Sequence, residues 1–245
     1  MWYELFKFFP FRPLVKWGFR ARIIHPENVP DHGGAILASN HLSSMDSIVL
    51  PAMLPRRLTF PAKAELFVGR DAKTKVVAWF LTAIGQVPMD RSGGRASASS
   101  LGTVTDVLAE GGLVGIYPEG TRSPDGRLYK GKTGAARMAL TAEVPIVPVG
   151  IIGTETVRGP FGLPWLRRPQ IVIGSPLDFS EYAHVPGNSA VLRHVTNEVM
   201  TAIQNLTGQE YADVYAFRVK SGDLKEVGSD DYVKPSPGGG PGPEV

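Results

Sequence analysis

The chain has 245 residues, which fits one domain with its own core, and its hydrophobic fraction of 43% is ordinary for a globular protein. It contains no cysteine, which excludes disulfides, thiolate metal sites and an acyl-cysteine intermediate. Its formal net charge of +3 hides an asymmetry, because the first 24 residues carry +4 and residues 221–245 carry −3.

The N-terminal segment, residues 1–24, interleaves basic and aromatic side chains. The basic residues are Lys7, Arg12, Lys16, Arg20 and Arg22, and Glu4 is the single acidic residue. The aromatic residues are Trp2, Tyr3, Phe6, Phe8, Phe9, Phe11 and Trp17. This pattern suits an anionic lipid interface, so we expect a membrane-associating helical segment, split near residues 9–13. The alternative is that these aromatics cap the core or form a dimer contact.

The rest of the chain predicts strands that alternate with helices. Short apolar runs predict strands at residues 34–39, 57–61, 113–117, 146–152 and 170–174. Helices are predicted at residues 43–53, 73–83, 94–110, 134–142 and 189–206. We therefore expect one α/β domain at residues 25–220, with helices on both faces of its sheet. Residues 221–245 form a Pro/Gly-rich tail that is disordered by composition.

No apolar run approaches the roughly 18 residues of a membrane-spanning helix, and charges and prolines break the N-terminus too often for a signal peptide. We expect peripheral attachment at the cytoplasmic face of the cell membrane. Residues 161–168, with Trp165, Arg167 and Arg168, fit an interfacial loop and a packed surface loop equally well.

His41 and Asp46 follow the first predicted buried strand. On a regular helix their spacing would separate them by about 140°, so they can meet only if His41 precedes the helix and Asp46 lies in its first turns. Ser43 or Ser44 would then be the N-cap. In that geometry Asp46 orients the imidazole and leaves its other nitrogen free to take a proton. Taken alone, such a pair is more often structural than catalytic.

The run from Pro118 to Ser123 follows another buried strand. Arg122 can grip a phosphate with two parallel donors, Gly120 lets a ligand approach the backbone, and Thr121 adds a hydroxyl. Glu119 could bind a substrate hydroxyl. The alternative is a polar turn held by an internal Glu119–Arg122 pair.

Residues 126–133 satisfy a phosphate-loop pattern that ends in Lys132 and Thr133. That pattern needs a strand leading directly into its first glycine, and here eight residues separate Tyr117 from Gly126. We reject the nucleotide hydrolase reading, but Lys132 at a predicted helix start remains a candidate to bind an anion.

Four segments, taken together in chain order, resemble the blocks of the glycerolipid acyltransferase family, closest to the 1-acylglycerol-3-phosphate acyltransferases. The matching features are Asn40, His41 and Asp46; Asp90 and Arg91; the Pro-Glu-Gly-Thr-Arg-Ser run at 118–123; and Pro148 in an apolar strand. Lys63 lies in a similar basic stretch between the first two blocks. The resemblance covers residues 25–180. The chain departs from it at 131–135, where no aromatic residue stands next to Lys132, and in having no long N-terminal membrane spans.

The resemblance implies a mixed, largely parallel sheet of the glycerol-3-phosphate acyltransferase type. It implies His41 as catalytic base with Asp46 behind it. It implies an acceptor site for 1-acylglycerol-3-phosphate, with phosphatidate as product, whose substrate-binding residues are Lys63, Arg91, Glu119, Gly120, Thr121, Arg122, Lys132 and Pro148. We expect no cofactor and no metal, with acyl-coenzyme A or acyl-carrier protein as the donor substrate. Oxyanion donors are expected among backbone N–H groups near the helix after His41.

Three other functions remain open. The acceptor could be glycerol-3-phosphate, another lysophospholipid or a glycolipid. The chain could be a non-catalytic module that binds anionic lipid, although such a module needs no base. A thioesterase would use water in place of the acceptor. The expected partners are thus an acyl donor, a lipid acceptor and a membrane surface, with no nucleic acid.

Overall fold

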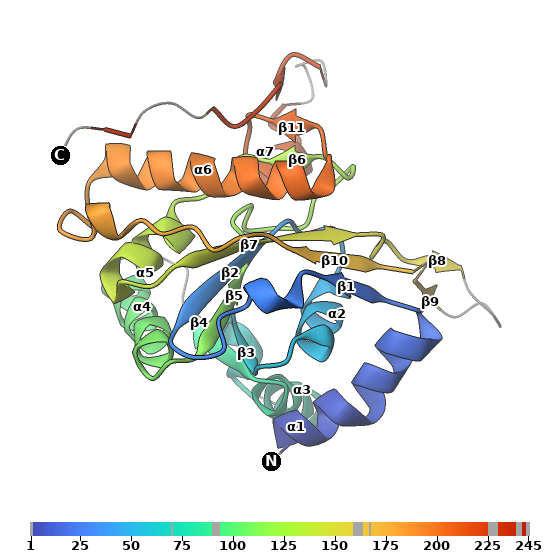
Figure 1. Ribbon diagram of the computed structural model, residues 1–245. Coiled ribbons are helices and arrows are strands. Elements are labelled where there is room, and N and C mark those ends of the chain that lie inside the picture. Colours follow the sequence, from blue (N-terminus) through green and yellow to red (C-terminus); the bar gives the residue numbers. More distant parts are fainter. Residues whose placement is uncertain are drawn as a thin grey trace.

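The computed structural model describes residues 2–69, 71–89, 94–158, 164–166, 168–224, 230–238 and 242–243. Within them, seven strands form a central sheet in the order β1-β10-β7-β2-β5-β3-β4 (Figure 1). In chain order these strands are β1 Arg22–Ile24, β2 Ala35–Ser39, β3 Leu58–Lys63, β4 Gln86–Met89, β5 Leu113–Ile116, β7 Ile146–Ile152 and β10 Gln170–Ile173. Each neighbouring pair is parallel except β10 and β7. The predicted mixed, largely parallel sheet is confirmed.

Helices cover both faces of the sheet, as the alternation of elements predicted (Figure 1). The α-helices are α1 Trp2–Phe6, α2 Asp46–Met53, α3 Ala72–Ala83, α4 Gly94–Ala109, α5 Gly134–Ala142, α6 Ser189–Thr207 and α7 Ala216–Ser221. Short 3-10 turns occupy Pro26–Asn28, Ala64–Phe67 and Ser180–Tyr182, and a two-stranded ribbon joins β8 Val157–Arg158 to β9 Pro164–Trp165.

Strand β2 is buried on both faces of the sheet and so contacts the helices on either side. Ala35 and Leu37 belong to the core that includes residues of α2, while Ile36 and Ala38 belong to the core beneath α4, α5 and α6. Successive side chains of a strand point to opposite faces, so one five-residue strand contributes to both cores. The chain that leaves β2 is therefore firmly held where it reaches the candidate site.

Helix α6 follows directly from its sequence. Asn188 caps it by accepting hydrogen bonds from the amides of Ala190 and Val191, and Gly208 ends it in the left-handed conformation. Its apolar residues recur at helical spacing and face the sheet: Val191, Leu192, Val195, Val199 and Ile203 are buried.

The N-terminal segment is helical and broken, as predicted, but it is not separate from the domain. Two π-helical turns, Lys7–Phe11 and Leu14–Gly18, follow α1, and Phe9 inside the first of them has non-helical backbone angles. Tyr3, Val15 and Phe19 are buried, and β1 joins the central sheet beside β10. The predicted boundary at residue 24 is therefore wrong, because the segment contributes both core side chains and an edge strand.

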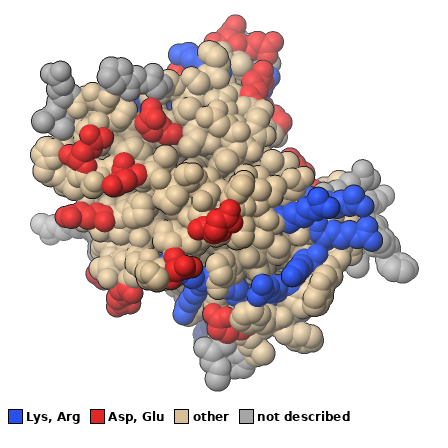
Figure 2. Space-filling view, in the orientation of Figure 1, with Lys and Arg blue, Asp and Glu red and all other residues tan. Residues whose placement is uncertain are grey.

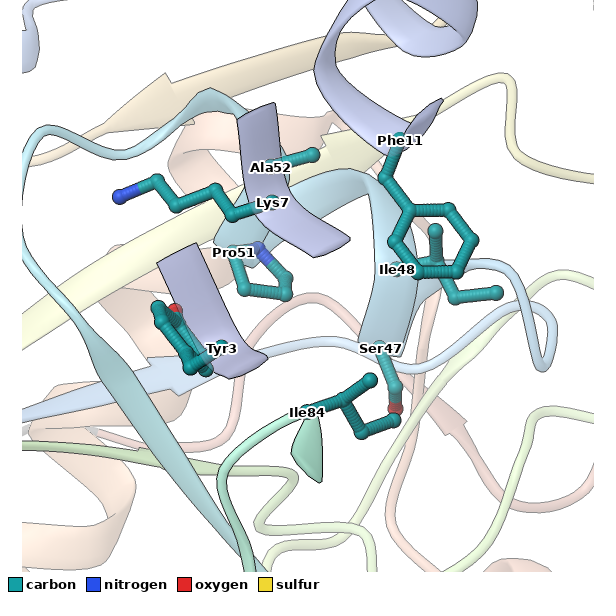
Figure 3. A pocket seen from close by; sticks show the side chains of 8 residues that line it. All are labelled: Tyr3, Lys7, Phe11, Ser47, Ile48, Pro51, Ala52 and Ile84. Carbon is teal, nitrogen blue, oxygen red and sulfur yellow. The ribbon is translucent and has the colours of Figure 1, made fainter. Parts of the chain in front are cut away.

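The N-terminal segment packs against α2, with only a small gap between them. Figure 3 shows Tyr3, Lys7 and Phe11 facing residues of α2, around a cavity of about 30 Å³. This volume is too small for a substrate, so we treat the cavity as a packing interface. The Lys7 ammonium extends away from it to the carbonyls of Pro55 and Arg56, just beyond the end of α2.

Among the described helices, none is both long and apolar enough to span a bilayer.

The C-terminal tail is partly ordered, which corrects its assignment as disordered from residue 221. In the described part of the chain, β12 Val233–Lys234 pairs with β11 Tyr211–Ala212, which pairs with β6 Leu128–Tyr129. Lys234 also forms an ion pair with Asp213 at 2.8 Å. Composition missed this strand because two backbone-paired residues need no apolar run.

Pro148 lies in an interior strand, although a proline in a strand is more typical of an edge or a bulge. Strand β7 stands between β10 and β2. The Pro148 carbonyl accepts a hydrogen bond from the amide of Gly174, just beyond the end of β10. In a strand, the amide and carbonyl of one residue point to the same side, so the missing N–H faces the place where this ladder ends. The proline therefore costs only one terminal ladder bond.

Candidate active site

The site forms where two neighbouring parallel strands end. Ala38 of β2 pairs with Ile116 of β5, so the residues just beyond them, His41 and Tyr117, lie side by side. Their rings stack at 3.9 Å between centroids, nearly parallel at 9°. Phe60 of β3 stacks on the other face of Tyr117 at 5.3 Å. Three adjacent strands thus lead to one ring each. The Tyr117 ring covers one face of the His41 imidazole, and part of the imidazole stays exposed to solvent.

Asn40 turns the chain from β2 toward His41. Its side-chain amide is buried and makes two reciprocal bonds with the backbone of Ile151 in β7: it donates to the carbonyl and accepts from the amide, both at 2.8 Å. A third bond joins it to Gln209 at 2.9 Å. The side chain replaces a strand neighbour for β7, so the main chain can leave the sheet without orphaning buried polar groups.

His41 and Asp46 meet as the spacing required. His41 Nδ1 lies 2.8 Å from Asp46 Oδ2, and the Asp46 side chain is fully buried. Oδ2 also accepts from the amides of Leu42 at 2.7 Å and Ser43 at 2.9 Å. Because an ionised carboxylate only accepts, Nδ1 carries the proton and Nε2 is left as the basic nitrogen. The His41 side chain remains 16% exposed.

The start of α2 differs from the prediction in one respect. Its N-cap is Met45 rather than Ser43 or Ser44, and Asp46 is its first residue. Asp46 folds back onto two amides of the preceding turn, while Ser43 Oγ accepts from the amide of Met45. No side chain caps α2, and the carboxylate instead holds the turn that precedes the helix. It also occupies the Leu42 and Ser43 amides, which are therefore not available as the expected oxyanion donors.

Glu119 has a role that the sequence did not indicate. Its carboxylate is buried and accepts from two backbone amides, His41 at 3.0 Å and Tyr129 at 2.9 Å. Burial raises its pKa to about 8, against these two hydrogen bonds, which lower it. The expected substrate contact and the Glu119–Arg122 pair are both corrected: Oε1 accepts from the backbone amide of His41 and Oε2 from that of Tyr129, and no Glu119–Arg122 ion pair forms among the described residues.

A pocket of about 490 Å³ connects His41 with a group of cations. His41, Thr121, Arg122 and Lys132 line it, together with Gly120. Gly120 has φ of 74°, and Arg122 and Lys132 are exposed. Neither cation forms an ion pair with an acidic side chain in the part of the chain that the structure describes. The pocket therefore combines a base with unneutralised positive charge, which suits an anionic substrate that carries a hydroxyl.

One predicted residue, Pro148, is not brought to this pocket. Pro148 is buried in the sheet against Gly174. The backbone of Lys63 ends β3 at the same edge as His41, but its side chain lies outside the described residues, as does Arg91. The phosphate-loop pattern at residues 126–133 lacks the strand that such a loop requires, because bends and not a strand lead into Gly126.

Two residues of the site, Tyr117 and Lys220, were not predicted from the sequence. Tyr117 stacks on His41, and burial followed by the charge of Asp46 raises its pKa well above the ordinary value, so it stays a neutral phenol. Its hydroxyl lies 3.1 Å from Ser47 Oγ. Lys220 reaches the loop from α7 and donates to Thr121 Oγ1 at 3.1 Å. The aromatic at the end of β5 was a possible signal for Tyr117; nothing local marked Lys220. Among the described residues, no group of three or more potential ligands could hold a metal.

This chain is similar to known proteins over much of its length. A sequence model described as "Acyltransferase" matches residues 20–152. The chain is 31% identical over 191 residues to the 1-acyl-sn-glycerol-3-phosphate acyltransferase of Bacillus subtilis, covering 77% of this chain and 90% of that protein. It is 32% identical over 133 residues to the human 1-acyl-sn-glycerol-3-phosphate acyltransferase alpha, covering 54% of this chain and 46% of that protein.

Among solved structures, this chain is similar to the 1-acyl-sn-glycerophosphate acyltransferase PlsC of Thermotoga maritima. The TM-score is 0.57 at 22% identity, over 82% of this chain and 80% of that one. At this identity the likeness supports the fold: a single α/β domain around a mostly parallel sheet.

Proposed function

Since the chain belongs to the acyltransferase family, we propose that it transfers a fatty acyl group to the 2-hydroxyl of 1-acylglycerol-3-phosphate and so makes phosphatidate. The observation that carries this proposal is the shared pocket: His41 lines the same cavity as Arg122 and Lys132. A base beside unpaired cations suits an acceptor that has both a hydroxyl to activate and a phosphate to bind. The substrate named for the bacterial and human relatives has both groups.

The mechanism follows from the hydrogen bonds of the dyad. His41 Nε2 takes the proton of the 2-hydroxyl while that oxygen attacks the carbonyl carbon of an acyl thioester. The C–O bond forms, the C–S bond breaks, and the proton on His41 passes to the departing thiolate. Asp46 keeps Nδ1 protonated and stabilises the imidazolium during the transfer. The donor is a thioester of coenzyme A or of acyl-carrier protein.

The residues around the dyad have separate tasks in this proposal. Arg122 and Lys132 bind the acceptor phosphate, with Arg91 and Lys63 as further candidates from the family resemblance. Thr121 and Gly120 shape the glycerol end of the pocket. Glu119 holds the His41 amide rather than the substrate. Tyr117 and Phe60 keep the imidazole ring in plane.

The proposal includes peripheral attachment to an anionic membrane, at its cytoplasmic face. Phe9 is 73% exposed and Trp17 is 71% exposed on the N-terminal segment. Trp79 of α3 is also exposed, and the rings of Phe11 and Phe80 join the segment to that helix. Figure 2 shows Lys and Arg side chains gathered on the side of the molecule that holds the N-terminal segment and β9. Exposed aromatics beside cations suit the headgroup region of an anionic bilayer.

A thiol-release assay tests the reaction. The purified chain is mixed with acyl-coenzyme A, or with acyl-carrier protein, and with each of several acceptors: 1-acylglycerol-3-phosphate, glycerol-3-phosphate, other lysophospholipids and a glycolipid. We expect thiol release that depends on 1-acylglycerol-3-phosphate, with phosphatidate as product. Release without any acceptor would instead identify a thioesterase. Lipid binding without release would identify a non-catalytic module.

A further inference from the structure

Helix α7 brings a cation, Lys220, to the loop of residues 118–123 from outside the family match, which ends at residue 152. The ammonium of Lys220 donates to Thr121 Oγ1 at 3.1 Å and to the carbonyl of Arg122. Phe217, on the same helix, places its ring 5.3 Å from the ammonium of Lys132. One short helix therefore contacts both cationic residues that line the pocket.

The position of α7 is fixed by the small sheet of β6, β11 and β12. Ala212 and Ala216 are buried with Tyr129, whose amide donates to Glu119. Asp213, between β11 and α7, forms ion pairs with Lys130 at 2.9 Å and Lys234 at 2.8 Å. Core contacts and ion pairs thus hold α7 beside the loop of residues 118–123. The contacts of Lys220 are therefore part of the packed structure of the domain.

The charges around Lys220 point to an anion. Lys220 forms no ion pair with an acidic side chain among the described residues. Burial and the positive charge of Arg122 lower its pKa, while the charge of Glu119 raises it. Bringing two cations together costs electrostatic energy in the free protein. A phosphate dianion in the pocket would remove that cost, so the arrangement is complementary to the acceptor headgroup.

We propose that Lys220 is a positioning residue for the acceptor phosphate, acting through Thr121 and Arg122. This inference rests on the proposed function. Gly120, with φ of 74°, starts this turn, and the Arg122 side chain has no ion pair of its own in the described structure. By binding the Thr121 hydroxyl and the Arg122 carbonyl, Lys220 fixes the backbone from which the guanidinium reaches the phosphate. Its contribution is to acceptor affinity and not to proton transfer.

Steady-state kinetics of three variants test this role. Lys220→Met removes the charge and both hydrogen bonds, Lys220→Arg keeps the charge and donors, and Arg218→Met changes an exposed cation of the same helix. We expect Lys220→Met to raise the KM for 1-acylglycerol-3-phosphate about tenfold or more, with kcat and the donor KM within about threefold of wild type. Lys220→Arg should recover much of the affinity, and Arg218→Met should match wild type.

A second acceptor makes the test specific for phosphate. Reaction with 1-acylglycerol, which lacks phosphate, should proceed at the same slow rate in wild type and Lys220→Met. An unchanged KM for 1-acylglycerol-3-phosphate in Lys220→Met would overturn the inference, as would an equal rise in Arg218→Met. An equal loss with both acceptors would also overturn it, because it would show a general structural role. If the wild-type chain transfers no acyl group to any acceptor, the proposed function itself is wrong.

Discussion

Three donors converge on one oxygen of Asp46, and its other oxygen, Oδ1, has no hydrogen-bond partner among the described residues. This asymmetry makes Asp46→Asn a clean probe. The amide oxygen can replace Oδ2, and the new NH₂ takes the place of Oδ1, so geometry is kept while the charge is lost. We predict that kcat falls by between about 100-fold and 10,000-fold. Acyl-transfer kinetics and a thermal melt check this; a kcat near wild type in a folded variant contradicts the role of the carboxylate.

Glu119 makes stability depend on pH. Its pKa rises from the ordinary 4.5 to about 8 in the folded protein, so the folded state holds a proton that the unfolded chain releases. This contribution is complete below pH 4.5 and is lost as pH rises to about 8. Unfolding free energy should therefore fall across this window, by at most about 1.4 kcal/mol per pH unit from this group. Denaturant titrations at several pH values measure it.

The matched variants are Glu119→Gln and, on the exposed surface, Glu110→Gln. Glu119→Gln should lose this part of the pH dependence. It should also lower the unfolding free energy by about 1–3 kcal/mol at pH 5, because its NH₂ would face one of the two backbone amides that donate to the Glu119 carboxyl group. Glu110→Gln should keep the wild-type slope. Identical slopes in all three proteins would show that Glu119 does not titrate in this range.

How much of the site could be predicted differs from residue to residue. The contact between His41 and Asp46 follows from their spacing. Residues five positions apart on one helix face different directions, so the two side chains can meet only if His41 precedes the helix and Asp46 lies in its first turn. The role of Glu119 does not, because its partners are backbone amides brought together by the two-residue strand β6. Lys220 is separated from Arg122 by 98 positions, and no pattern in the sequence encodes that contact.

At the scale of elements, strands and helices with a clear period were predicted well. The α5 bounds match the prediction because a glycine-rich start and a charged end frame a short apolar helix. The interior position of Pro148 could not be predicted, because the order of strands in a sheet depends on tertiary pairing. The sequence shows that a proline lacks a donor but not which neighbour would have received it.

The junction of β2 with β7 gives a prediction at this scale. Asn40→Ala removes both partners of the Ile151 backbone, which is buried. We predict that the unfolding free energy falls by about 2–5 kcal/mol, since each orphaned buried group costs about 1–3 kcal/mol. The control is Asn28→Ala, which removes one hydrogen bond to the Ile173 carbonyl. Equilibrium denaturation should show a clearly smaller loss for the control; equal losses would mean that Asn40 does not brace this junction.

For the whole molecule, the N-terminal segment has two faces with different partners. Its inward face packs on the domain through Tyr3 and Val15, while Phe9 and Trp17 point to solvent. The sequence showed which residues are aromatic and basic, but not which of them the core would take. The proposed membrane surface therefore includes only the outward residues, and α3 extends it.

Vesicle binding tests this surface. A Phe9→Ser, Trp17→Ser double variant should bind anionic vesicles at least about tenfold more weakly than wild type, because two exposed aromatic rings no longer enter the interface. Phe217→Ser, which removes an exposed ring from α7, should bind like wild type. Binding to vesicles should also weaken as salt is raised. Equal binding by all three proteins would exclude the N-terminal surface as the attachment site.

The most direct test of the account is acyl transfer by His41→Ala to 1-acylglycerol-3-phosphate from acyl-coenzyme A. The histidine side chain is held by Asp46 and Tyr117 while its backbone is held by Glu119, so the variant should fold and bind the acceptor. We predict that product formation falls by at least about 100-fold while the melting temperature stays close to wild type. A folded His41→Ala protein that makes phosphatidate at the wild-type rate would contradict the central claim that His41 is the base.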